Sequence, residues 1–435
     1  MASRRRSFRH RRSNLVNGFD IAAVLIAIAA VCGYVSRRVL RLPATSGTLV
    51  VALASSLLVV AADAAVPALR LRDTVATFLS SVDFTDALLR GMLCFLLFAG
   101  ALHLDLEGLL DNKWTISMLA TAGVVLSTAL VGLLAWWAFQ RAGIDIAFDL
   151  CLVFGALISP TDPIAVMGML KQLRGPREIE SLIAGESLFN DGIAVVVFFA
   201  LASLAGLITG DATDLAAGWM GLVVFFVREV GGGVAVGLAF GYVAYRALMS
   251  IDDHPLELLI TVALAMFVYA LSFTLQVSGP IAVVLAGLLI GNPGRRLAMS
   301  ARTREHVDAF WTMVDEIFNA VLFLMLGLEV FAVAARPALL ATALFAIPIA
   351  LLARAVSVAI PLAAVCARRG LSRGMIPIVT WSGLRGGLSV AMMLSLPPFP
   401  ARDLLLAATY AVVVFSIVAQ GLTVRRLLVH YRMAI

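Results

Sequence analysis

Residues 159–166 read SPTDPIAV and interrupt an apolar segment that runs over about 148–170. The two prolines remove backbone hydrogen-bond donors, and each disfavours helix at the residue before it. Asp162 precedes Pro163, so we expect it at a break in the helix. Broken helices at membrane depth expose backbone carbonyls and helix ends, which are tolerated only in a protein interior or a polar cavity and can bind ions. The stretch predicts a functional break; a proline kink capped by Asp162 is the alternative, and both can hold together.

The amino-acid composition predicts an integral membrane protein. Of 435 residues, 61% are hydrophobic and 14% are charged, whereas soluble domains are about half apolar and about a quarter charged. A soluble fold of this length would need more polar residues to cover its surface, so the apolar excess indicates a lipid bilayer. The net charge of +6 is better explained by topology and anionic lipid than by nucleic acid, which we do not expect as a partner.

Thirteen apolar segments are long enough, or nearly so, to cross a bilayer as helices. They run over about 19–35, 44–64, 87–104, 114–140, 148–170, 179–208, 215–249, 255–276, 279–291, 310–334, 338–366, 374–397 and 403–424. The sequence therefore predicts an all-α polytopic membrane protein. We expect an Arg-rich N-terminal tail at 1–18 and a single transmembrane domain over 19–430.

Basic residues in the connections between segments predict the orientation in the membrane. The odd-numbered connections and the C-terminus together contain 18 Lys and Arg residues, and the even-numbered connections contain 6. Positive charge concentrates on the cytoplasmic side, so we expect the C-terminus in the cytoplasm. The six arginines within the first twelve residues conflict with the external N-terminus that thirteen spans require. Either the first segment does not span, or it is processed like a signal peptide, or the downstream charges override the tail.

The sixth segment carries a second polar motif, ESLFND, which begins at Glu186. Helical spacing places Ser187 and Asp191 on one face, and Glu186 and Asn190 on a neighbouring face. Oxygen ligands of this kind suit a hard cation such as Na+. The motif predicts an ion site, and the alternative is a buried hydrogen-bonded network.

Two of these acids are expected at the same depth in the membrane. Asp162 precedes the connection between the fifth and sixth segments, and Asp191 follows it. At about 1.5 Å per residue, both carboxylates lie roughly 13–20 Å from the cytoplasmic face, near the middle of a core of about 30 Å. Two acids at one depth on successive helices strengthen the prediction of an ion site.

Three basic residues lie deep inside the segments, away from the segment ends, where a charge costs about 2.5–3.5 kcal/mol at the bilayer centre and needs a partner. Arg354 lies in the otherwise apolar eleventh segment, and we expect it to pair with Glu186, which leaves Asp191 for transport. Arg228 adjoins Glu229 in the seventh segment. The sequence leaves open whether these two residues are structural.

The third intramembrane base, Arg385, lies in the stretch WSGLRGG (381–387) of the twelfth segment. Glycines around a mid-segment arginine predict a second broken helix, seven segments after the first. Paired broken helices in corresponding halves are typical of inverted-repeat transporters. If the two breaks cross, Arg385 and the helix ends balance the charges and dipoles there.

The motifs together resemble the cation/proton antiporters of the NhaP and NHE type. The matching stretches are SPTDPIAV (159–166), GESLFNDGIAVVVF (185–198), WSGLRGG (381–387) and FSIVAQGLTV (415–424). The resemblance implies an NhaA/NhaP-like fold of about thirteen transmembrane helices with inverted repeats and two crossing broken helices. It also implies a homodimer, in which each protomer has a dimerisation part and a mobile core part.

The resemblance also implies roles for individual residues. Asp191 would bind cation and proton in turn, and Asn190 matches the asparagine that the family associates with electroneutral exchange. Thr161 and Asp162 would form the crossing. Thr161 and Ser187 would help Asp191 to coordinate Na+.

Further roles and one departure follow from the same comparison. Glu186 would pair with Arg354, and Arg385 occupies the family's Gly-Leu-Arg-Gly stretch. Many relatives carry an acidic residue in the third segment, where this chain has Ala99, which cannot ligate a cation. The ion site then lacks one carboxylate, which bears on Na+ affinity and selectivity. His103 could titrate near neutral pH, or it is an interfacial histidine with satisfied hydrogen bonds.

We therefore expect a secondary antiporter that exchanges Na+ or Li+ for H+ by competition at a midplane aspartate, with no net charge movement. A desolvated carboxylate holds a proton more readily than one in water, and a bound cation competes with that proton. We expect a multi-pass protein of the cell membrane, the inner membrane of a bacterium, with no cofactor beyond the transported ions. The four cysteines lie far apart in apolar runs, without a metal or disulfide pattern.

Three alternatives remain at this point. A K+/H+ or mixed Na+/K+ antiporter would keep the fold and change the ion. An intramembrane aspartyl protease would use Asp162 and Asp191 as a catalytic dyad, and would need neither broken helices nor Arg354. A channel would conduct ions without proton coupling.

Overall fold

The computed structural model describes residues 18–41, 44–66, 84–173, 175–208, 219–334, 343–366 and 374–431. Within these ranges the chain is helical, apart from turns and one isolated antiparallel bridge between Asp162 and Leu384. The predicted Arg-rich tail at 1–18 lies outside the described residues, except for Gly18.

The helices of the described ranges are numbered in chain order. They are α1 (Gly18–Val35), α2 (Ala44–Ala65), α4 (Phe84–Asp86), α5 (Leu93–Leu102), α6 (Leu106–Asp111), α7 (Lys113–Met118), α8 (Val124–Arg141), α9 (Phe148–Ile158), α10 (Ile164–Leu173), α11 (Arg177–Leu204), α13 (Trp219–Leu248), α14 (His254–Leu275), α15 (Gly279–Leu289), α16 (Arg295–Leu297), α17 (Ala301–Ala334), α19 (Ala346–Cys366), α20 (Met375–Ser382), α21 (Gly387–Ser395), α22 (Arg402–Phe415) and α23 (Gly421–His430). Wider π-helical turns adjoin several of them, at Ser36–Leu40, Ala87–Met92, Leu119–Gly123, Ile290–Gly294 and Ser416–Gln420.

Nine helices among the described residues are long and apolar enough to cross a membrane. They fall on nine of the thirteen predicted segments. The other four predicted segments fall on α2, on α9 with α10, on the short helix α15, and on α20 with α21. The two interrupted pairs are the segments for which the sequence predicts breaks. The protein is thus an all-helical membrane protein in the described ranges.

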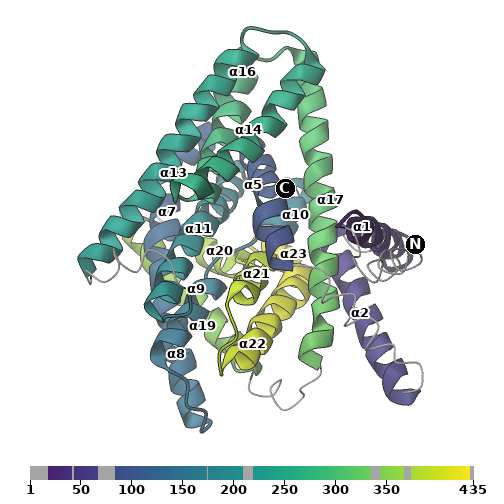
Figure 1. Ribbon diagram of the computed structural model, residues 1–435, viewed down its shortest axis with the longest axis vertical. Helices are drawn as coiled ribbons and strands as arrows, with labels where there is room; N and C mark the ends of the chain where they lie inside the picture. The colour runs from purple at the N-terminus through teal and green to yellow at the C-terminus, as the bar shows by residue number, and fades with distance from the viewer. Residues whose placement is uncertain are drawn as a thin grey trace, which may run out of the picture.

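The long helix α17 begins earlier than the sequence predicts. The apolar segment starts at about 310, whereas the helix starts at Ala301. The added first turns are polar, so the apolar character of the sequence does not indicate them. In Figure 1, α17 runs along one side of the helix bundle, and α1 and α2 pack against its outer side.

The apolar core divides into two large clusters, and each broken helix has one half in each. Ile158 of α9 and Val390 of α21 belong to one cluster. Leu170 of α10 and Ile378 of α20 belong to the other. The two breaks therefore lie at the boundary between the apolar clusters, where Figure 1 shows α20 and α21 in the middle of the bundle.

The first break separates α9 from α10. Helix α9 ends at Ile158 and α10 begins at Ile164. The five residues between them contain Pro160 and Pro163, which lack the N–H groups that would continue the helix. The extended backbone here pairs with the second break, because the N–H of Asp162 donates to the carbonyl of Leu384 at 2.7 Å.

The second break separates α20 from α21 and depends on close approach of the backbone. A Cβ at Gly386 would lie 2.8 Å from Oδ2 of Asp162, and a Cβ at Gly383 would lie 2.4 Å from Nε of Arg354. Gly386 has φ −112°, which other residues adopt, so the requirement for glycine is steric. Gly386 allows the two unwound stretches to touch, and Gly383 allows Arg354 of α19 to approach the second break.

We predict that Gly386→Ala lowers the melting temperature of the purified protein in detergent. The added methyl must displace Asp162, and overpacking of this kind costs about 1–3 kcal/mol. Gly168→Ala is the matched control, because a Cβ at Gly168 in α10 meets nothing within 4 Å. Differential scanning fluorimetry on both variants provides the measurement. Equal melting temperatures for the two variants would show that the breaks are not tightly packed.

Candidate functional site

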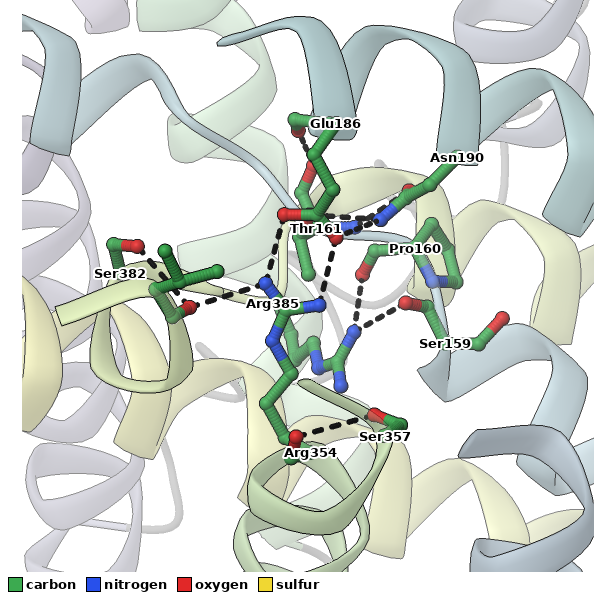
Figure 2. A network of polar contacts seen from close by, with 11 residues as sticks. Ser159, Pro160, Thr161, Glu186, Asn190, Arg354, Ser357, Ser382 and Arg385 are labelled. Carbon is green, nitrogen blue, oxygen red and sulfur yellow. Dashed lines mark hydrogen bonds and ion pairs between the residues drawn. The ribbon is translucent and has the colours of Figure 1, made fainter. Parts of the chain in front are cut away.

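The two breaks meet in a network of buried polar groups, shown in Figure 2. Arg385 follows the bridge residue Leu384 and is 3% exposed. Its Nη1 donates to the carbonyl of Ser159 and, at 2.9 Å, to the carbonyl of Pro160. These carbonyls lie just beyond the C-terminal end of α9, where the helix dipole is negative. The guanidinium therefore satisfies carbonyls that the break leaves without helical partners.

Asp162 begins the second half of the same broken helix. Its Oδ1 accepts a hydrogen bond from the N–H of Ile164 at 2.9 Å, at the first residue of α10. A carboxylate in this position favours the positive end of the helix dipole. The helix break that the prolines predict and the cap by Asp162 are therefore both present. The side chain of Asp162 is half-buried.

Asn190 of α11 holds the unwound stretch in place. Its Oδ1 accepts from the N–H of Thr161 at 3.1 Å, and its Nδ2 donates to Oγ1 of Thr161 at 2.9 Å. The Nδ2 also donates to Oε1 of Glu186 at 3.1 Å. Ser187 adds a hydrogen bond from its hydroxyl to the carbonyl of Thr161. One turn of α11 thus fixes the backbone and the side chain of Thr161 (Figure 2).

Glu186 and Arg354 form a buried ion pair between α11 and α19. Nη1 and Nη2 of Arg354 donate to Oε1 and Oε2 of Glu186 at 2.7 Å and 2.8 Å. The Nη2 also donates to the carbonyl of Val379 in α20 at 3.1 Å. Glu186 is 1% exposed and Arg354 is 6% exposed. A two-point pair of this kind fixes orientation as well as charge, and it ties α11, α19 and α20 together.

Asp191 differs from the other acids of the site. No described residue donates a hydrogen bond to its carboxylate or forms an ion pair with it. Asp162, Glu186 and Arg385 lie close enough to act on it electrostatically. The side chain is half-buried and lines a large cavity. Asp191 is therefore an uncommitted carboxylate in contact with accessible space.

The cavity has a volume of about 2110 Å³. Thr161, Asp162, Ser187 and Asp191 line it, whereas Glu186 and Asn190 do not. The predicted ion-site residues therefore divide into four that line the cavity and others that support them from behind. Away from the crossing, the lining carries more acidic than basic residues, namely Asp105, Glu107, Asp111, Glu178, Glu180, Asp315 and Glu316 against Arg37, Arg41, Arg177 and Arg425. Of these acids, Glu107 pairs with Arg296 at 2.9 Å.

The remaining sequence-predicted positions lie apart from the crossing. Ala99 lines the cavity and contributes no oxygen. His103 lies at the exposed rim, where Nδ1 contacts the carbonyl of Ala99 at 2.7 Å and Nε2 contacts Oγ1 of Thr312 at 3.4 Å. Arg228 donates to Oε1 of Gln276 at 2.7 Å, away from the cavity.

Sequence reasoning missed a support for Arg385. Its backbone N–H donates to Oγ of Ser416 at 2.8 Å, and that hydroxyl donates to Oε1 of Gln420 at 2.6 Å. Gln420 reaches back to the carbonyl of Trp381 at 3.3 Å. The available signal was the presence of a serine and a glutamine four residues apart in the apolar stretch FSIVAQGLTV (415–424).

Comparison with known proteins shows which family the chain belongs to. Residues 26–430 match the family described as sodium/hydrogen exchanger, transmembrane. The Na(+)/H(+) antiporter NhaP of Pseudomonas aeruginosa is 43% identical over 410 residues, which are 93% of this chain and 95% of that protein. The Na(+)/H(+) antiporter NhaH of Halobacillus dabanensis is 36% identical over 353 residues, which are 79% of this chain and 83% of that protein.

A solved structure shares the fold. The sodium proton antiporter MjNhaP1 from Methanocaldococcus jannaschii superposes with a TM-score of 0.70 and 16% sequence identity. The match covers 94% of this chain and 96% of that chain.

We predict that Arg354→Ala lowers the melting temperature in detergent more than Ser187→Ala does. Removing one partner leaves a buried, uncompensated charge, which costs about 3–5 kcal/mol, whereas loss of one hydrogen bond costs about 1 kcal/mol. The double variant Arg354→Met with Glu186→Gln should recover part of the loss, because it removes both charges. Additive losses in the double variant would contradict a direct ion pair.

Proposed function

Because the chain belongs to the transmembrane sodium/hydrogen exchanger family, we propose that it exchanges Na+ or Li+ for H+ across the membrane at Asp191. The observation that carries this proposal is the uncommitted carboxylate of Asp191 beside the crossing. Glu186 is held by Arg354, and Asp162 caps α10. Asp191 can therefore exchange its bound ion without breaking a structural contact. The exchange needs no cofactor, and the family assignment to transporters excludes the protease alternative.

The oxygens around Asp191 suit a small monovalent cation. The carboxylate of Asp162 and the hydroxyl oxygens of Thr161 and Ser187 line the same cavity as Asp191. Both hydroxyls are already oriented, because Asn190 donates to Thr161 and Ser187 donates to the carbonyl of Thr161. Hard oxygen ligands of this type bind Na+. In this proposal Asn190 and the Glu186–Arg354 pair position the ligands, and Asp191, Thr161 and Ser187 contact the ion.

The exchange follows from competition for one carboxylate. A cation and a proton each neutralise Asp191, so each displaces the other. A bare carboxylate is costly to move through a low dielectric, so the site changes sides only when it is loaded. One cation then moves for one proton, and no net charge crosses the membrane.

The moving part is proposed to contain the crossing and the helices tied to it. Arg385, Asn190 and Arg354 link α9, α11, α19 and the second break by buried contacts. These elements can shift as a unit against the rest of the helices without losing the contacts. Thirteen transmembrane helices in two inverted repeats, each with one broken helix, account for this arrangement.

The described conformation is proposed to open to the cytoplasm. The cavity reaches Arg37, Arg177 and Arg425, which belong to the predicted cytoplasmic side. The acidic excess in its lining attracts cations. In the most apolar stretch of helix α1, and likewise of α13, only 22% of the residues are buried. The exposed apolar side chains can contact lipid or the second protomer of a homodimer.

A K+/H+ or mixed exchange is the second candidate. Ala99 lines the cavity and contributes no oxygen, so the ion site has one charged ligand fewer than the family resemblance implies. Fewer negative charges around the ion give a weaker electrostatic field, and such a site discriminates less strictly among Na+, Li+ and K+. Competition among Na+, Li+ and K+ in the same transport assay separates the two candidates.

We predict that Asp191→Asn removes exchange while the protein stays folded. Liposomes that contain a pH-sensitive dye and a proton gradient should show dequenching when Na+ or Li+ is added to wild type, and none above protein-free liposomes for the variant. An unchanged elution profile in size-exclusion chromatography serves as the folding control. Exchange by the folded variant at the wild-type rate would overturn the proposal.

We further predict that an imposed membrane potential leaves the exchange rate unchanged. Valinomycin with a K+ gradient sets the potential, the same gradient without valinomycin controls for K+/H+ exchange, and Na+-driven dye dequenching reports the rate. One-for-one exchange moves no net charge, so positive, zero and negative potentials should give equal rates. A rate that follows the potential would show a different stoichiometry.

A further inference from the structure

One wall of the cavity is a face of α17 that the proposed mechanism does not use. Thr312, Asp315, Asn319 and Leu322 all line the cavity. They are three or four residues apart, so they lie on one face of the helix. This face carries polar oxygens on the side of the cavity where α5 offers Ala99 and no carboxylate.

The face runs from the rim of the cavity to the crossing. At the rim, Oγ1 of Thr312 lies 3.4 Å from Nε2 of His103. At the crossing, Leu322 packs so closely on Gly387 that a Cβ there would lie 2.4 Å from Cδ1 of Leu322. Asp315 and Asn319 lie between these two levels. Both residues therefore line the cavity between the rim and the crossing.

Asn319 carries an oxygen without a partner. The residue is 0% exposed, and its buried Oδ1 has no hydrogen-bond partner among the described residues. Its Nδ2 donates to the carbonyl of Asp315 at 2.8 Å and to Oδ1 of Asp315 at 3.0 Å. Both partner atoms are acceptors, so a flipped amide would place oxygen against oxygen. The hydrogen bonds therefore fix which end of the amide is left unpaired.

We propose that Oδ1 of Asn319 and the carboxylate of Asp315 form a second binding site for a monovalent cation, which the ion occupies on its way to Asp191. Amide and carboxylate oxygens are the ligands that hard cations prefer, and the carboxylate supplies the charge. A carboxylate that accepts a hydrogen bond has several lone-pair positions and can also ligate a cation.

The position of this site suits transfer to the crossing. Asn319 precedes Leu322 by three residues, about 4.5 Å along the helix axis, and Leu322 contacts the second break. The site lies on α17 and uses none of the ligands of α10 and α11, so it can hold the ion before Asp191 releases its proton. The inference rests on the proposed exchange and adds the approach route of the cation to it.

The first test measures the KM for Na+ in proteoliposomes. Asn319→Leu keeps the shape of the side chain and removes the oxygen, and it should raise the KM about 3- to 10-fold with Vmax little changed. Thr128→Val is the matched control, because Thr128 is 4% exposed, has an unpartnered hydroxyl and does not line the cavity. An unchanged KM in folded Asn319→Leu would overturn the proposal.

A second variant keeps the proposal testable if Asn319→Leu does not fold. Asn319→Asp adds a carboxylate beside Asp315, and it should lower the KM for Na+ and make the melting temperature rise more with NaCl than in wild type. The cation then screens two adjacent negative charges. A KM that stays unchanged or rises would contradict a cation site.

The last measurement separates this proposal from the proposed exchange. In the Asp191→Asn background, NaCl should still raise the melting temperature relative to choline chloride, and the added Asn319→Leu change should remove that rise. If Asp191→Asn keeps exchange, the proposed function fails while this comparison still reports on the wall site. An NaCl effect that is equal with and without Asn319→Leu would overturn the second site.

Discussion

A helix that breaks at membrane depth leaves carbonyl and N–H groups without helical partners. In this protein the groups freed by one break are satisfied by the other break and by side chains. Arg385 donates to carbonyls at the end of α9, and the N–H of Asp162 donates to Leu384. Each break thus needs the other. The contact also explains Gly386, because a side chain there would push against Asp162, whereas Gly383 leaves room for the side chain of Arg354.

The same constraint sorts the buried charges into fixed and free groups. A buried ion in a low dielectric is stable only when a partner offsets its desolvation. Glu186 has such a partner in Arg354, with two hydrogen bonds. Arg385 uses carbonyl dipoles in place of a carboxylate. Once these groups are assigned, Asp191 is the carboxylate at the crossing for which no described residue is a direct partner.

The sequence predicts much of this arrangement because its signals are local. Prolines around Asp162 indicate a break, and ESLFND spacing indicates which oxygens share a helix face. Arg354 and Glu186 are matched because an apolar span offers an arginine few partners. The network around Thr161 and Ser416 is not predictable in this way. Contacts such as Arg385 with Ser159 join residues more than two hundred positions apart. Which residues meet in this way depends on how the helices pack.

The start of α17 and its role in the cavity show the same limit. Its first turns are polar, so hydropathy places the start at about 310 instead of Ala301. Asn319 looks like an ordinary polar residue in a span until packing shows which end of its amide is paired. Helical periodicity places Asp315 and Asn319 on one face, but only the packing of α17 on α5 and α21 turns that face into the cavity.

The division between fixed and free groups bears on the ratio of ions exchanged. Protonation of Glu186 would break a two-point pair that links three helices, and protonation of Asp162 would weaken the cap of α10. Either change would loosen the crossing that carries the site. Asp191 can gain and lose charge while these contacts persist, because no described residue depends on its charge for a hydrogen bond. A site with one such carboxylate and a rigid surround has a physical reason to exchange one cation for one proton.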